Sequence, residues 1–104
     1  MRILAAVLGL ALLSGNAVAD DRFDGLKKMN TDMCITAGGQ IDAHPKDPKL
    51  VKPFCNCLTE TYWDSVPKAD VKELLTTGNS IGIQNNIEKR MDAATAVCKK
   101  KVGF

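Results

Sequence analysis

The stretch that decides the fold is PFCNCLTETYW, residues 53–63, because it places two cysteines two positions apart in a segment with helical spacing. Its apolar positions recur at steps of three and four residues, as in an amphipathic helix, and are Val51, Cys55, Leu58 and Tyr62. Successive helical residues turn by roughly 100°, so Cys55 and Cys57 leave the helix about 160° apart. We therefore expect the two sulfurs to bond to partners on opposite sides of this helix.

Two other cysteines, Cys34 and Cys98, complete an even set of four in a short chain. Such a set in an exported protein is typical of a two-disulfide framework. The pairing is either Cys34–Cys57 with Cys55–Cys98 or Cys34–Cys55 with Cys57–Cys98, and the spacing leaves both open. In the chain-entropy account, loops of this length contribute about 3 to 4 kcal/mol each, comparable with the net stability of a small domain. Reduction is expected to unfold the protein or nearly so.

The central helix is predicted to start at Pro48 or Pro53, since proline is tolerated in a first turn, and to end at Asp64. Before it, a first helix occupies residues 20–37 and stops at Gly38 and Gly39. The apolar stripe of that first helix is Phe23, Leu26, Met29 or Asn30, Met33 and Ala37. The proline-rich residues 40–47 form a loop between the two helices.

Two more helices follow the central one. The third is predicted over residues 67–77, with Gly78 as a left-handed cap. The fourth is capped by Asn79 or Ser80 and ends before Gly103. Its apolar stripe is Ile83, Ile87, Met91, Ala94 and Cys98. No stretch alternates with period two over the length of a strand, so the predicted fold is an all-α, four-helix domain over residues 20–104, linked by two disulfides.

Residues 1–19 have the pattern of a cleaved secretory signal peptide. Arg2 gives the positive start, residues 3–13 form an apolar run, and residues 17–19, AVA, supply small side chains before the cleavage point. The apolar run is shorter than the about 20 residues that a membrane span needs, and the lipoprotein acceptor position holds Asn16 instead of cysteine. We expect a periplasmic or secreted protein without a membrane anchor.

The charge balance argues against nucleic acid as a partner. The chain has 14 basic and 12 acidic residues, and removal of Arg2 with the signal peptide leaves a net charge of +1. Proteins that bind nucleic acid by neutralising phosphates need a clear basic excess on one face. The three lysines at residues 99–101 are explained by the negative end of the last helix dipole.

No catalytic constellation is visible in the sequence. The only histidine is His44, and Ser65 and Ser80 lie at a helix edge and at a cap without a nucleophile motif. About 85 residues also leave little volume for a deep cleft. We predict a protein that is not an enzyme and that holds no cofactor.

Thiol-redox or metal chemistry at Cys55 and Cys57 is the alternative function. A redox pair is usually spaced by two residues at a helix start beside a strand, and this spacing is one. Soft metals such as Cu(I) prefer the residue types of these cysteines, of His44 and of Met29, Met33 and Met91. Thiolate ligands must stay reduced, however, and methionines at helical spacing are typical of a core. No metal site is predicted.

Binding of another protein is the function that remains. Trp63 falls on the polar side of the central helix, where an exposed tryptophan would anchor a partner, unless the helix after Pro67 covers it. His44, Lys49 and Lys52 mark a second candidate surface on the neighbouring loop. The predicted role is that of an inhibitor, immunity or adaptor protein. An acid-stress chaperone, whose helices would open at low pH, is a further alternative.

Overall fold

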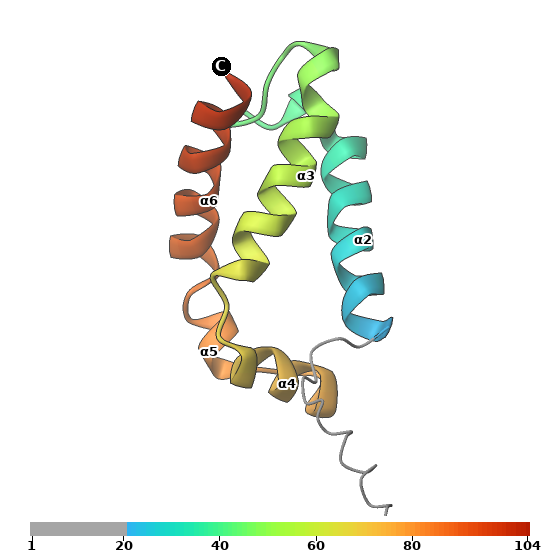
Figure 1. Ribbon diagram of the computed structural model, residues 1–104, viewed down its shortest axis with the longest axis vertical. Helices are drawn as coiled ribbons and strands as arrows, with labels where there is room; N and C mark the ends of the chain where they lie inside the picture. The colour runs from blue at the N-terminus through green and yellow to red at the C-terminus, as the bar shows by residue number, and fades with distance from the viewer. Residues whose placement is uncertain (1–20) are drawn as a thin grey trace, which may run out of the picture.

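The structure is a computed structural model that describes residues 21–104, and over this range the chain is helical without a strand (Figure 1). The predicted signal peptide lies outside the described residues. The order of elements is α2 (Asp21–Ala37), the 3₁₀ turn η2 (Gly38–Gln40), α3 (Pro48–Asp64), α4 (Lys68–Thr77), α5 (Ile81–Gln84) and α6 (Ile87–Val102). None of the described helices is long and apolar enough to cross a membrane.

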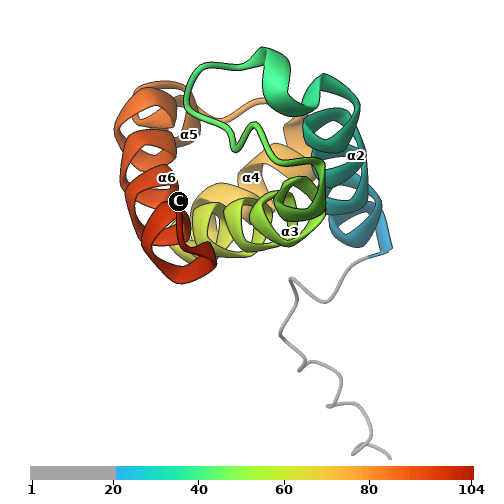
Figure 2. The ribbon, with the colours of Figure 1, turned by 90° about the horizontal axis from the view of Figure 1, so that it is seen from above.

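Helix α3 is the centre of the fold, with α2 along one side and α6 along the other (Figures 1 and 2). It begins at Pro48, the earlier of the two predicted starts, because the Asp47 side chain accepts a hydrogen bond from the Lys49 backbone N–H at 2.9 Å. Pro53 lies inside the helix. The loop of residues 41–47 crosses one end of the three helices, and α4 and α5 lie at the other end (Figure 1).

The predicted stripe of the first helix needs a correction. Phe23 is buried as expected, but Met29 and Met33 are 51% and 63% exposed. The side chains of Asn30 and Cys34 face α3 in their place, through a hydrogen bond and a disulfide. Those two contacts fix the rotation of α2 about its axis. Apolar spacing alone did not distinguish Met29 from Asn30 as the residue that faces α3.

The predicted fourth helix is two helices in the structure. The Ser80 hydroxyl caps α5 by accepting a hydrogen bond from the Ile83 N–H at 3.3 Å, but helical structure is interrupted at residues 85 and 86. There Asn86 Nδ2 donates to the Gly82 carbonyl at 2.8 Å, an example of a short amide side chain competing with the helical backbone. The chain then continues as α6, which ends at Gly103 with φ of 95°.

The predicted stripe of the fourth helix is confirmed only in part. Ile83, Ala94 and Cys98 are buried, whereas Ile87 and Met91 are 47% and 38% exposed. The break between α5 and α6 places Ile83 in a separate helix, whereas Ile87 and Met91 lie in α6 with the buried Ala94 and Cys98 and are exposed all the same.

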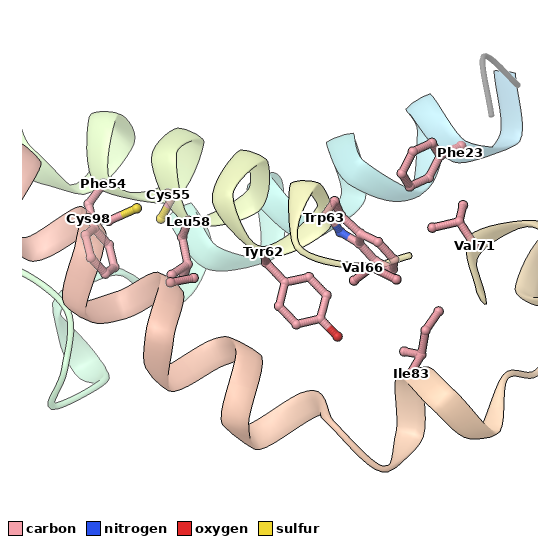
Figure 3. Packing of buried hydrophobic residues seen from close by; sticks show 11 residues of the cluster. Phe23, Phe54, Cys55, Leu58, Tyr62, Trp63, Val66, Val71, Ile83 and Cys98 are labelled. Atoms are coloured by element: carbon pink, nitrogen blue, oxygen red, sulfur yellow. The ribbon is translucent and has the colours of Figure 1, made fainter. Parts of the chain in front are cut away.

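The core has two parts, which Figure 3 shows along α3. Between α3 and α6 lie Phe54, Leu58 and Tyr62. At the junction of α2, α4 and α5 with the end of α3, the buried residues are Phe23, Trp63, Val66, Val71 and Ile83. Gly82 of α5 lies against the Asp70 side chain of α4, so that a Cβ there would lie 2.5 Å from Asp70 Oδ2 unless this carboxylate moved.

Candidate functional site

The two disulfides are Cys34–Cys55 and Cys57–Cys98, one of the two pairings that the spacing allowed. They confirm that the sulfurs of Cys55 and Cys57 leave α3 on opposite sides, one toward α2 and the other toward α6. Cys55 and Cys57 therefore do not bond to each other, because each is bonded to a cysteine of a different helix. Two disulfides indicate an oxidising compartment outside the cytoplasm.

His44 is buried beside the first disulfide. Its exposed fraction is 8%, and Nδ1 lies 3.9 Å from Cys34 Sγ. The imidazole also packs edge to face against the fully buried Phe54, with 4.9 Å between ring centroids. His44 was predicted as part of a partner surface, but the loop turns it inward, where a partner does not reach it in this conformation.

The loop of residues 41–47 is held inward by backbone and side-chain contacts. The His44 backbone N–H donates to the Ile41 carbonyl at 2.9 Å, and Pro45 is fully buried. Lys46 Nζ donates to the Gly39 carbonyl at 2.6 Å, which ties the loop to the end of α2. These contacts fix the position of the imidazole relative to the disulfide.

Burial lowers the pKa of His44, because desolvation disfavours the charged imidazolium. A hydrogen bond with the Gly38 backbone opposes this shift, and the positive charge of Lys46 adds to it. The lowered pKa favours the neutral form of the ring.

Cys34, His44 and Cys55 form a group of three potential metal ligands whose ligand atoms all lie within 4.8 Å of one another. It is the one such group of cysteine, histidine or acidic side chains found in residues 21–104.

The second disulfide has a different neighbour. The Thr61 hydroxyl lies 3.6 Å from Cys57 Sγ and 3.5 Å from Cys98 Sγ.

Trp63 contributes to the packing between α3 and α2. It is 9% exposed, and its Nε1–H donates to Asn30 Oδ1 at 2.9 Å. The Phe23 ring packs edge to face against the indole, with 5.4 Å between centroids. The sequence left open whether the helix after Pro67 covers this side chain, and α2 supplies the hydrogen bond and the Phe23 contact.

Burial raises the pKa of Tyr62, the residue before Trp63, and the positive charge of Arg90 opposes this shift.

Lys49 and Lys52 are the two predicted partner-binding residues that are exposed. Their ammonium groups form no ion pair with a residue in the described range. Lys52 borders a cleft of about 340 Å³ between η2 and the start of α3. The cleft is lined by Ile35, Gly38, Gly39, Lys46, Pro48, Val51 and Lys52.

The sequence reasoning missed the approach of His44 to Cys34. A usable signal was present, because Gly38 ends the first helix four residues after Cys34 and the loop must return to Pro48 within a few residues. A short loop with two fixed proline positions has to pass close to the end of the helix that carries the disulfide. Which loop side chain points inward depended on packing against Phe54.

Comparison of the chain with protein-family models, with curated proteins and with solved structures finds no match.

Proposed function

We propose that this protein is a non-catalytic binding protein of an oxidising compartment, and that it binds another protein at the cleft between η2 and the start of α3. The observation that supports the proposal is the pair of exposed ammonium groups of Lys49 and Lys52, without ion-pair partners among the described residues, beside a cleft whose lining is partly apolar and partly polar. The role is that of an inhibitor, immunity or adaptor protein.

The chemistry of the cleft indicates the kind of segment that would fit. Ile35, Pro48 and Val51 provide apolar walls for a small hydrophobic side chain. Lys52 lies on the rim, and Lys49 is one turn earlier on the same helix. An aspartate or glutamate next to a small apolar residue would complement both features.

The first disulfide joins the two helices that carry Ile35 and Val51, which line the cleft. Ile35 follows Cys34 in α2, and Val51 precedes Cys55 by one turn in α3. The Lys46 hydrogen bond to Gly39 closes the third side. A surface that is ordered before binding loses less conformational entropy on association, which favours affinity from a small area.

Site-specific photo-crosslinking in cells of the source organism tests this proposal. A photoreactive residue at position 52 should yield a crosslinked protein that the same residue at the exposed position 72 of α4 does not. The captured protein is then purified, and its affinity for the unmodified chain is measured by calorimetry at two salt concentrations.

Charge reversal distinguishes a binding site from a crosslinking artefact. Lys49→Glu with Lys52→Glu should weaken the complex at least about tenfold and reduce its salt dependence, because rim charges steer association. The matched control is Lys72→Glu with Lys100→Glu, which changes the net charge equally at two other exposed positions. Equal affinities of the two double variants would contradict the proposed site.

A further inference from the structure

The group formed by Cys34, Cys55 and His44 has the composition and spacing of a metal site that the disulfide keeps closed. Cys55 is fully buried, His44 is 8% exposed and Cys34 is partly buried. The imidazole Nδ1 faces the Cys34 sulfur at 3.9 Å. Two sulfurs and one imidazole nitrogen are ligands that Cu(I) and Zn²⁺ prefer.

The three ligand atoms lie close enough to reach one ion after local movement. Ligands bonded tetrahedrally at about 2.3 Å for sulfur and about 2.0 Å for nitrogen lie roughly 3.5 to 3.8 Å from one another. The distance from Cys34 Sγ to His44 Nδ1 is already 3.9 Å. The two sulfurs, which are 2.10 Å apart in the oxidised protein, need to separate, and Cys55 Sγ and the imidazole, which lie within 4.8 Å of each other, need to approach to about 3.5 Å.

We infer that reduction of the Cys34–Cys55 disulfide creates a two-thiolate, one-imidazole site for a thiophilic d¹⁰ cation, Cu(I) or Zn²⁺. The reductant is a dithiol, which donates two electrons, breaks the S–S bond and becomes a disulfide itself, while its two protons pass to Cys34 and Cys55. Binding of the cation then releases those two protons, because the ligands are thiolates. Three protein ligands leave a position on the ion for a small molecule or a transfer partner.

The packing around His44 holds this ligand in place before the cation arrives. The ring lies against Phe54, and the Ile41 carbonyl and the buried Pro45 fix the backbone on either side. A ligand that is already oriented loses little freedom on binding. The inference is independent of the proposed partner cleft, because it concerns buried atoms and not the Lys49 and Lys52 side chains.

The second disulfide is an internal control that the chain provides. Cys57 and Cys98 are also joined between two helices, but their neighbour is the neutral hydroxyl of Thr61. Reduction there yields two thiols without an imidazole. A cation that merely required a reduced pair of cysteines would bind at both places.

The experiment is anaerobic titration of the dithiol-reduced chain, after removal of the reductant, with Zn²⁺ and separately with Cu(I), each against a chromophoric chelator. We expect one tightly bound cation per chain, and the same stoichiometry for Cys57→Ala with Cys98→Ala. His44→Phe keeps an aromatic ring against Phe54 and should weaken binding at least about tenfold, since loss of an outer-shell partner alone typically costs that much. Sulfur and nitrogen ligation is read from X-ray absorption of the Zn²⁺ form.

The folding state is followed in the same samples by circular dichroism. Either the reduced chain stays helical and binds the cation, or it loses helix and the cation restores it, and both results support the site. Cation binding without native helix content would overturn the inference. So would equal affinity of the His44→Phe variant, or equal affinity of Cys34→Ala with Cys55→Ala. The oxidised His44→Phe protein, with both disulfides and native helix content, controls for misfolding.

Discussion

On each side, α3 is joined to a neighbouring helix by a disulfide, but the residues around the two disulfides differ. On the α2 side, Cys34–Cys55 lies beside the buried His44, and the hydrogen bonds of Thr31 with Thr59 and of Asn30 with Trp63 continue the contact along the helix. On the α6 side, Cys57–Cys98 is accompanied by the Thr61 hydroxyl and by apolar contacts. The difference indicates that the α6 side is a structural interface, whereas the α2 side also gathers groups able to do chemistry.

Removal of either disulfide should give the largest loss of stability, and a slightly larger one on the α6 side. The Cys57–Cys98 bond closes a loop of 41 residues and Cys34–Cys55 a loop of 21. Chain entropy then predicts losses of about 4 and about 3 kcal/mol for Cys57→Ala with Cys98→Ala and for Cys34→Ala with Cys55→Ala. Urea unfolding checks both values, and full reduction should leave little folded protein. A reduced protein with an unchanged melting temperature would contradict the entropic account.

The hydrogen bond from Trp63 to Asn30 should give the next largest effect, on the α2 side. Trp63→Phe retains an aromatic ring but leaves the Asn30 amide oxygen without its donor, which should cost about 1 to 3 kcal/mol of unfolding free energy. A double-mutant cycle with Asn30→Ala isolates the pair by urea unfolding. Additive losses would show that the indole contributes through packing alone.

The same substitution, threonine to valine, can be made on each side of α3, and its two effects can be compared directly. Thr31→Val breaks a 2.8 Å hydroxyl pair with Thr59 and should cost about 1 kcal/mol. Thr61→Val removes only long contacts with sulfur, at 3.5 and 3.6 Å, and should cost about 0.5 kcal/mol or less. Thermal unfolding of both variants tests the order, and a larger loss at position 61 would reverse our assignment of the two sides.

The smallest effect is a pH dependence specific to the α2 side. The folded protein lowers the pKa of His44, so the unfolded chain binds more protons when the pH falls below the unfolded value of about 6.5. The contribution of His44 to the free energy of unfolding is complete above that pH. It decreases as the pH falls toward the pKa of His44 in the folded protein. Melting temperatures between pH 8 and pH 5 should therefore decrease more for the oxidised wild type than for His44→Phe. Parallel profiles would show that His44 is not the titrating group.

The proposed partner cleft and the proposed cation site both lie on the α2 side but use different atoms. The cleft depends on exposed lysines and on apolar walls that the oxidised Cys34–Cys55 bond keeps apart at fixed distance. The cation site requires the same disulfide to be reduced. The two experiments are therefore run on oxidised and reduced protein respectively, and each can fail without the other.

The sequence by itself determined the helical class, the central position of α3 and the opposite directions of Cys55 and Cys57. These follow from local physics: apolar spacing, proline and glycine at helix ends, and the angle between residues two positions apart in a helix. The same rules placed one cap at Gly78, which the structure confirms, and another at Asn79 or Ser80, of which the structure shows Ser80.

Only the tertiary structure decided which disulfide pairing forms and which loop side chain lies against Cys34. The physical reason is that each depends on contacts between residues distant in sequence, such as His44 with Phe54 and Trp63 with Asn30. Apolar spacing gives the face of a helix to within about one residue, but a specific hydrogen bond or disulfide fixes its rotation. The burial of His44, which the sequence placed on a partner surface, and of Trp63, whose burial the sequence left open, follows from that packing.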